Sequence, residues 1–467
     1  MTRTGELVFT DLYELTMAAG YVAADHTDDA TFDLFVRSLP DRRHFLVAAG
    51  LASVLDHLES LHVTEAELAH LRRLDWVDDD FCDLLDGLRF TGEVRAVAEG
   101  EVVYPGEPIL TVTAPRVEAQ VVETRLLNLV ASQTMIASKA ARVAIACGDR
   151  RFVEFGSRRA HGADAAMQAA RSAYLAGSAG TSLVSAGVAY GLPLAGTMAH
   201  SFVMSFDDES DAFRAFARRF PDGAVLLIDT YDTEEGARRA VQVADELAPE
   251  GVRIGGVRLD SGDLVRLSRS VRRILDDGGL AEATIFASGD LDEYRIAEIV
   301  AAGAPIDAFG VGTQLVTSAD APSLGAVYKL VADTSGSRIK LSEDKVTLPG
   351  PKQVWRVSDG DTDIYDVIAL DGEELRGHLD GGARLEARPM LETVMSGGRR
   401  TRPDPTLAES RDRCAGAVWR LPDRLRSLHQ RERPYEIQRS PDLTALVETL
   451  TASHRSHGNR QDGENRR

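Results

Sequence analysis

The chain has 467 residues, of which 44% are hydrophobic and 27% charged, with a formal net charge of −20. Its length exceeds that of a typical single core, so we expect two domains. The acidic balance argues against nucleic acid or a membrane surface as a partner. No apolar run approaches the roughly 18 residues of a membrane span, and the first residues lack the apolar core of a signal peptide.

The three cysteines, Cys82, Cys147 and Cys414, are far apart in the sequence. They form neither a disulfide framework nor a cluster with metal-ligand spacing. Scattered cysteines without a disulfide framework fit a reducing compartment, so we expect a cytoplasmic protein.

Residues 1–130 are predicted to form an α+β domain. Thr10 or Asp11 would cap a helix whose apolar positions recur at 12, 15 and 19, and helical patterns continue to about residue 89. Residues 93–115 predict a strand, a turn built on Pro105 and Gly106, and a second strand. The segment 120–147 is again helical in pattern.

From residue 151 the pattern becomes a regular alternation of strand and helix. Short apolar runs recur at 151–155, 192–195, 225–228, 254–259, 284–287 and 308–311, with helical patterns between most of them. This alternation predicts an irregular (β/α) barrel over residues 131–345, with a doubly wound open sheet as the alternative. Residues from about 345 to 450 are expected to complete the N-terminal domain, and the polar segment 453–467 to be disordered.

Side chains that follow the carboxyl ends of barrel strands share one site. In chain order they are Phe155, Arg158 and Arg159; Thr197 and His200; Asp229 and Asp232; Arg258, Asp260, Ser261 and Asp263; Ser288, Gly289 and Asp290; and Gly310, Gly312 and Thr313. Arginines bind anions, and glycine turns before helices let the backbone approach a phosphate. This mixture predicts a site for a phosphorylated sugar and a divalent metal, with Asp260 on ribose or Mg²⁺.

Simpler roles exist for several of these residues. A histidine at a strand end is often structural, and Asp232 has the alternative role of capping the next helix. Arg258 with Asp260 also fits a solvated salt bridge, and paired glycines also fit ordinary turns.

Six segments together resemble the nicotinate phosphoribosyltransferases, in the order of that family. They are residues 10–13, 154–160, 196–202, 227–232, 256–263 and 309–313. The resemblance extends from about Thr10 to Val331. It implies a (β/α) barrel with an additional domain from both chain ends, and homodimers whose active sites form between subunits.

The resemblance also implies the reaction. Nicotinate and 5-phosphoribosyl 1-pyrophosphate would give nicotinate mononucleotide and pyrophosphate, coupled to ATP hydrolysis and assisted by Mg²⁺. His200 matches a histidine that is transiently phosphorylated. Tyr13, from the partner subunit, and Phe155 would sandwich the pyridine ring, and Arg158, Thr197 and Arg258 would complete the nicotinate site. Asp260 would hold ribose or Mg²⁺, with the phosphates bound by Ser288, Gly289, Gly310, Gly312 and Thr313.

Other readings are open at this stage. Related nicotinamide-using enzymes place an aspartate after the Gly-Thr pair, where Met198 stands here, which favours nicotinate. Quinolinate-type relatives are shorter and lack the His200 chemistry. A barrel aldolase needs a Schiff-base lysine, yet Lys329 is the only lysine between residues 140 and 339. An inactive, nucleotide-binding relative is not favoured, because every motif position carries a competent residue.

Overall fold

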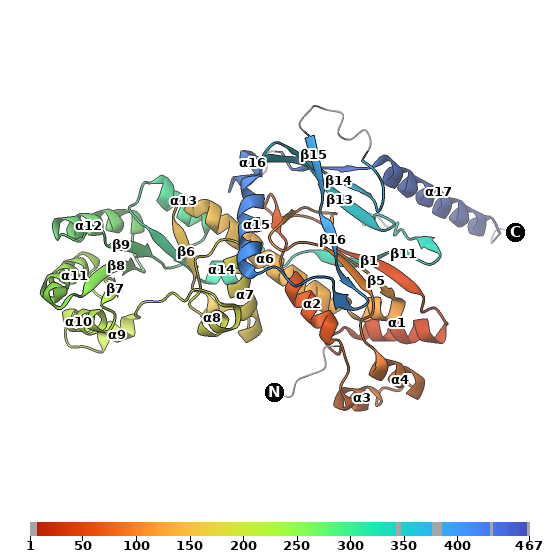
Figure 1. Ribbon diagram of the computed structural model, residues 1–467, viewed down its shortest axis with the longest axis horizontal. Coiled ribbons are helices and arrows are strands. Elements are labelled where there is room, and N and C mark those ends of the chain that lie inside the picture. Colours follow the sequence, from red (N-terminus) through yellow and green to blue (C-terminus); the bar gives the residue numbers. More distant parts are fainter. Residues whose placement is uncertain (1–6, 342–346, 376–384, 430–432, 465–467) are drawn as a thin grey trace. The chain divides into compact units, whose positions relative to one another are not determined.

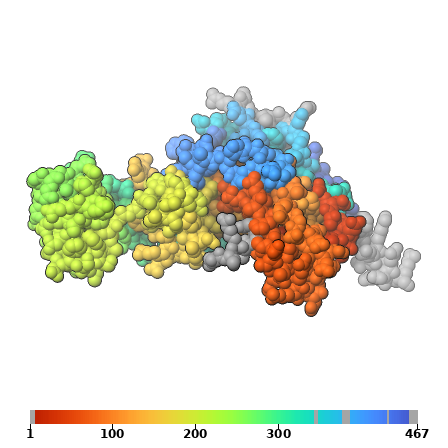
Figure 2. All heavy atoms as spheres, turned by 60° about the horizontal axis from the view of Figure 1, so that its bottom comes forward, coloured from red at the N-terminus to blue at the C-terminus, as the bar shows by residue number. Residues whose placement is uncertain are grey.

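The chain divides into two units, one built from both chain ends and one from the middle. Unit 1 comprises Met1–Thr134 and Ser323–Arg467, and unit 2 comprises Met135–Pro322. The computed structural model describes residues 7–341, 347–375, 385–429 and 433–464. The predicted boundary at residue 345 and the last three residues of the predicted tail lie outside this set. Figure 2 shows the two segments of unit 1, red to orange and blue, packed against each other.

A seven-stranded antiparallel sheet is the centre of unit 1 (Figure 1). Its strands, in spatial order, are β12 (Gly336–Ser337), β11 (Ala326–Asp333), β1 (Asp29–Val36), β5 (Pro108–Pro115), β3 (Glu93–Val97), β16 (Leu391–Ser396) and β17 (Arg399–Arg400). The predicted pair of strands in 93–115 is confirmed, because β3 and β5 pair antiparallel. β11 and β16 enter from the C-terminal segment, so the sheet joins the two chain ends.

Strand β1 was missed by the sequence prediction, which treated residues up to about 89 as helical. Its residues are buried along nearly its whole length, so the apolar–polar alternation of a half-exposed strand is absent. The one acidic residue within it, Asp33, is 1% exposed and is compensated inside the core. Lys352 Nζ lies 2.9 Å from Asp33, and Thr111 donates a hydrogen bond to it at 2.7 Å.

Helices cover this sheet and bury its apolar side chains in one core. In the N-terminal segment they are α1 (Leu12–Ala23), α2 (Leu51–Ser60), α3 (Glu65–Leu71), α4 (Asp79–Gly87) and α5 (Arg116–Val121). Asp11 occupies the N-cap position of α1, as predicted, although its side chain makes no capping bond. Helix α6 (Glu123–Cys147) continues from unit 1 into unit 2.

A second sheet, of four strands, belongs to the C-terminal segment of unit 1. Its order is β15 (Leu385–Pro389), β13 (Lys352–Asp359), β14 (Thr362–Leu370) and β18 (Glu436–Arg439), and a two-stranded sheet pairs β2 (Leu46–Val47) with β4 (Val102–Val103). Helices α15 (Leu407–Trp419), α16 (Asp423–Arg426) and α17 (Pro441–Glu464) complete the unit. The segment predicted as a polar tail begins within α17. Among the described helices, none combines the length and apolar character needed to cross a membrane.

Unit 2 is built on parallel strands in the order β6 (Arg151–Glu154), β10 (Ala308–Val311), β9 (Thr284–Ala287), β8 (Arg253–Leu259) and β7 (Asp222–Leu227). Two isolated parallel bridges extend the sheet from Glu154 to Thr181 and from Thr181 to Leu194. The last strand, β10, therefore pairs with the first, β6, and neighbouring strands follow chain order around a ring. Within the described residues, the bridges leave one opening, between Leu194 and β7.

This ring order is that of an irregular (β/α) barrel rather than of a doubly wound sheet, in which the strand order reverses at a switch point. The helices of the unit are α7 (Ala163–Leu175), α8 (Val184–Tyr190), α9 (His200–Met204), α10 (Glu209–Arg219), α11 (Thr233–Leu247), α12 (Leu264–Asp277), α13 (Glu293–Ala301) and α14 (Thr313–Val316). In Figure 1, α10, α11 and α12 lie side by side along β7, β8 and β9. The mixed α/β fold class is as predicted.

Tyr328 on β11 tests the packing of unit 1. Its ring stacks on Phe32 with centroids 4.8 Å apart, and its buried hydroxyl donates to the carbonyl of Ala119 at 2.9 Å. We expect Tyr328→Phe to lower the free energy of unfolding by about 1 kcal/mol, because a buried hydrogen bond is lost. Urea denaturation followed by circular dichroism measures the change. Tyr21→Phe, which alters a half-buried tyrosine of the same unit, is the control and should stay within about 0.5 kcal/mol of the parent; equal stability of both variants would contradict the prediction.

Candidate active site

The parallel strands of unit 2 end at one edge of the sheet, and the predicted side chains follow these ends. Phe155 follows β6, Arg258 and Asp260 lie at the end of β8, and Ser288 follows β9. Thr197 and His200 come shortly after the bridge at Leu194. Because carboxyl ends of neighbouring parallel strands meet, these residues from distant segments lie close together.

Arg258 is the centre of this site, and its side chain is 16% exposed. Its Nε donates to Ser288 Oγ at 2.8 Å, and its Nη1 donates to Thr197 Oγ1 at 3.2 Å. Its Nη2 pairs with Asp260 Oδ1 at 2.7 Å. The guanidinium thus joins three strand ends and is held in one orientation, which is what recognition of a planar carboxylate requires.

Asp260 is ionised and partly exposed beside this arginine. Partial burial raises the pKa of Asp260, but the hydrogen bond from Ser288 and the charges of Arg258 and His200 outweigh it and hold the pKa below its usual value. Asp260 Oδ1 accepts from both Arg258 and Ser288. Asp260 Oδ2 lies 3.8 Å from His200 Nε2, beyond hydrogen-bond distance. One carboxylate oxygen is therefore open to a ligand.

His200 begins the short helix α9, and its side chain is 41% exposed. Its Nδ1 shares a hydrogen bond of 3.1 Å with Thr230 Oγ1, while Nε2 faces Asp260. The ring is thus oriented from one side by a hydroxyl and attracted from the other by a carboxylate. A histidine held in this way near the surface can exchange a proton or a phosphoryl group with a bound ligand.

An aromatic wall stands beside the arginine. The guanidinium carbon of Arg258 lies 5.8 Å from the centroid of the Phe155 ring, which lies 5.5 Å from that of Phe286. Gly310 makes this arrangement possible, because a Cβ there would lie 2.8 Å from Phe155 Cδ2. A flat ring that carries an anionic group matches a wall of aromatic carbon beside a cation.

The glycine turn at Gly289 has a structural role in the packing of the strands. Gly289 has a φ of +99°, and a Cβ there would lie 2.1 Å from the carbonyl oxygen of Asp260, so the turn packs on the end of β8. Asp292 already caps α13 by accepting from Arg295, and α14, which begins at Thr313, is only one turn long. Of the two helix starts near these glycines, one is thus already capped by a carboxylate and the other belongs to a single turn.

The remaining predicted residues take no part in the hydrogen bonds of Arg258 described above. Arg158 is exposed on the 3₁₀ turn Ser157–Arg159. Tyr13 lies on α1 of unit 1 and is 47% exposed. Burial and the carboxylates of Glu123 and Glu14 raise the pKa of Tyr13, so its phenol stays neutral. Gly312 and Thr313 lie at the start of α14.

Aspartates 229 and 232 have structural roles. Asp229 Oδ2 accepts from the amide of Asp260 at 2.9 Å and from the hydroxyl of Ser261 at 2.7 Å, and so ties the end of β7 to the end of β8. Asp232 accepts from the amide of Glu235 at 2.8 Å and caps α11, the simpler of the two roles considered for it. Within the described ranges, no three His, Cys, Asp or Glu side chains form a metal cluster.

Two groups escaped the sequence analysis. Thr230, which orients His200, lies three residues past the end of β7, and the sequence prediction considered only the aspartates on either side of it, Asp229 and Asp232. Glu154 is 1% exposed and accepts from Thr181 and from the amide of Gly156, which fixes the turn that presents Phe155. Burial raises the pKa of Glu154, although its hydrogen bonds oppose this. A buried acid at the end of an apolar strand was the signal for it.

Comparisons with known proteins agree with this arrangement. The family model for the nicotinate phosphoribosyltransferase N-terminal domain matches residues 8–131, and the model for the nicotinate phosphoribosyltransferase family matches residues 150–353. The nicotinate phosphoribosyltransferase pncB2 of Mycobacterium tuberculosis is 46% identical over 444 residues, which cover 95% of this chain and 93% of that protein.

Solved structures show the same fold. The crystal structure of human nicotinic acid phosphoribosyltransferase superposes with a TM-score of 0.84 at 32% identity, covering 94% of this chain and 99% of that one. A nicotinate-nucleotide pyrophosphorylase from Pyrococcus furiosus gives a TM-score of 0.71 at 25% identity, covering 88% and 94% of the two chains. With two family models and a relative at 46% identity along nearly the whole sequence, the chain belongs to the nicotinate phosphoribosyltransferase family.

Proposed function

We propose that the protein is a cytoplasmic, ATP-coupled nicotinate phosphoribosyltransferase that forms nicotinate mononucleotide from nicotinate and 5-phosphoribosyl 1-pyrophosphate, the first step of NAD synthesis from nicotinate. The observation that carries this proposal is the Arg258 guanidinium, fixed by Thr197, Ser288 and Asp260 beside the Phe155 ring. It offers a cation beside the face of an aromatic ring, which suits the carboxylate and ring of nicotinate.

The residue after Thr197 supports nicotinate over its amide. Met198 is 6% exposed, and its backbone carbonyl accepts from Arg258 Nη1 at 3.4 Å. An aspartate in its place would put a second negative charge near Arg258 and repel a carboxylate ligand. Met198 therefore leaves the Arg258 cation available to the substrate.

Catalysis at the sugar needs no protein nucleophile, since the pyridine nitrogen of nicotinate attacks the anomeric carbon as pyrophosphate leaves. The side chains position the two substrates and stabilise the developing charge. Phe155, with Tyr13 of a partner subunit, orients the ring, and Arg158 lies on the exposed side of the site, where anionic substrates arrive. The phosphates lie along Ser288, Gly289, Gly310, Gly312 and Thr313.

Asp260 is the residue that fits a magnesium ion. Its Oδ2 accepts no hydrogen bond from Arg258 or Ser288, and Mg²⁺ typically takes one or two carboxylates together with phosphate oxygens. Bound there, the ion would neutralise charge on the departing pyrophosphate. Asp260, kept ionised by Arg258, would hold it and the ribose hydroxyls.

His200 is proposed to accept the γ-phosphoryl group of ATP on its imidazole, releasing ADP. Water later cleaves the phosphorus–nitrogen bond and releases phosphate. The phosphorylated ring adds negative charge beside Asp260, which reorganises the site and couples ATP hydrolysis to nucleotide formation. Thr230 holds the ring in place throughout.

We expect His200→Ala to abolish stimulation by ATP while leaving slow, ATP-independent formation of nicotinate mononucleotide, because the phosphoryl acceptor is lost but the substrate site is intact. Chromatography of reactions with and without ATP measures this. His70→Ala, at an exposed histidine of unit 1, should behave as the parent. ATP coupling that survives in His200→Ala would refute the phosphohistidine, and no product from the parent enzyme under either condition would refute the activity itself.

Arg258→Ala should raise the KM for nicotinate at least tenfold, because a charge-assisted hydrogen bond contributes about 1.5–3 kcal/mol. The KM of Arg258→Lys for nicotinate should fall between those of the parent and of Arg258→Ala, since lysine keeps the charge but not the planar fork. Arg253→Ala at the opposite end of β8 is the matched control. Initial rates at varied nicotinate concentration decide the matter, and a parental KM in Arg258→Ala would remove this residue from the site.

The proposed homodimer with shared sites predicts complementation. Tyr13→Ala and His200→Ala subunits mixed at random should regain about a quarter of the ATP-coupled activity, because half the dimers are mixed and each has one intact site. Either variant alone should show little. Verified mixed dimers without recovered activity would argue that each site is built from a single chain.

A further inference from the structure

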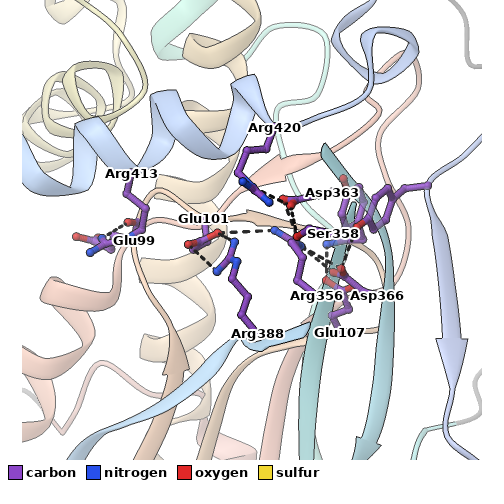
Figure 3. Close-up of polar contacts among 12 residues, drawn as sticks. Glu99, Glu101, Glu107, Arg356, Ser358, Asp363, Asp366, Arg388, Arg413 and Arg420 are labelled. Atoms are coloured by element: carbon purple, nitrogen blue, oxygen red, sulfur yellow. Dashed lines mark hydrogen bonds and ion pairs between the residues drawn. The ribbon is translucent and has the colours of Figure 1, made fainter. Parts of the chain in front are cut away.

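A polar groove of about 450 Å³ lies in unit 1, outside every residue considered so far. It is lined by Glu101, Ser358, Glu386, Ala387, Arg388, Arg413, Gly416, Ala417 and Arg420. In Figure 3, Arg413 and Arg420 extend from α15, and Arg388 approaches Glu101 from the opposite side. Three guanidinium groups from two elements thus border one cavity.

The contacts of these arginines hold them in place without using all their donors. Arg388 donates to both oxygens of Glu101, at 3.1 and 2.7 Å. Arg420 donates from Nε to Asp363 at 2.9 Å and from Nη2 to a backbone carbonyl at 3.2 Å, and Arg413 donates from Nη1 to the carbonyl of Glu99 at 2.8 Å. A guanidinium carries five N–H donors, so each arginine keeps some for a ligand.

The carboxylates behind the groove are shared with a fourth, fully buried arginine. Arg356 makes a bidentate pair with Asp366 at 3.0 and 2.7 Å. It also lies 3.7 Å from Glu101 and 4.0 Å from Asp363. The negative charges of Glu101 and Asp363 are therefore divided between Arg356 and the groove arginines.

A fourth carboxyl of this cluster, that of Glu107, is buried behind the groove. Burial and the adjacent charge of Asp366 raise the pKa of Glu107 well above its usual value. The guanidinium groups of Arg356, Arg388, Arg413 and Arg420 stand among these carboxyls, and Asp361 Oδ1 lies 3.8 Å from Arg420 Nη1 at the exposed edge. Glu386 is exposed at the rim, where water screens its charge. Three of the four arginines border the cavity, in a chain whose net charge is −20.

We propose that this groove binds a small phosphate-bearing anion, of the size of pyrophosphate or the polyphosphate of a nucleotide. Several oxygens on one ligand match several guanidinium forks. A nucleic acid would carry the same group, but the acidic chain repels a polyanion of that length. The proposal does not depend on the enzymatic activity.

The test is calorimetric titration of the full-length protein with inorganic pyrophosphate, and separately with ATP. Arg388→Gln and Arg413→Gln should each raise the dissociation constant of the groove site at least tenfold. This is the loss expected for a charge-assisted contact of about 1.4 kcal/mol or more. Arg402→Gln changes an exposed arginine of the same unit outside the groove and should bind as the parent. Thermal unfolding without ligand verifies that each variant is folded.

Thr313→Ala, at a residue proposed to bind the substrate phosphates, separates this groove from the candidate active site. Anion binding that persists in Thr313→Ala and is weakened by Arg413→Gln supports the groove, whether or not the protein makes nicotinate mononucleotide. Binding that responds only to Thr313→Ala, or to none of the variants, overturns the groove. Weakening seen with ATP but not with pyrophosphate also overturns it, because the phosphates would then not be what is recognised.

Discussion

The hydrogen bonds of the Arg258 guanidinium to three separate strand ends are the interaction on which the site depends. Asp260 and Ser288 meet because β8 pairs with β9, and Thr197 reaches them because β10 pairs with β6 and the strands follow a ring. The barrel thus positions a cation whose partners come from different strands. Removing any partner frees one edge of the guanidinium, and a freely rotating arginine loses the planar match to a carboxylate.

Charge placement explains how an acidic chain handles anionic ligands. Asp260 neutralises Arg258 only in part, because its Oδ1 also accepts from Ser288 and its Oδ2 faces His200. Asp229 accepts hydrogen bonds from the amide of Asp260 and the hydroxyl of Ser261 instead of pairing with Arg258. The acidic residues near the site therefore orient it without cancelling its positive charge.

Much of this architecture was predictable because β-α alternation and strand-end chemistry are local patterns. Thr284–Ala287 and Ala308–Val311 are strands within the predicted bounds, and Arg258, Asp260, Ser288 and Thr197 do meet as the barrel rule requires. The helical prediction for the residues of strand β1 was wrong, since a strand buried on both faces has no alternation to detect. Its Asp33 contacts residues 78 and 319 positions away in the sequence, which no local pattern reveals. Thr230 was missed because orienting a histidine needs only one hydroxyl, which no spacing rule marks.

The groove and the candidate active site use the same device with different partners. In each, an arginine is paired with a carboxylate that also interacts with a second group. In the candidate active site Asp260 also accepts a hydrogen bond from Ser288, and in the groove Glu101 and Asp363 also lie near Arg356. An anchored guanidinium loses little conformational entropy on binding, while shared carboxylates leave part of its charge for a ligand. An arginine fully paired with one carboxylate is rigid but neutralised, and an unpaired one is charged but mobile. Sharing the acid is how both requirements are met in a chain with so many carboxylates.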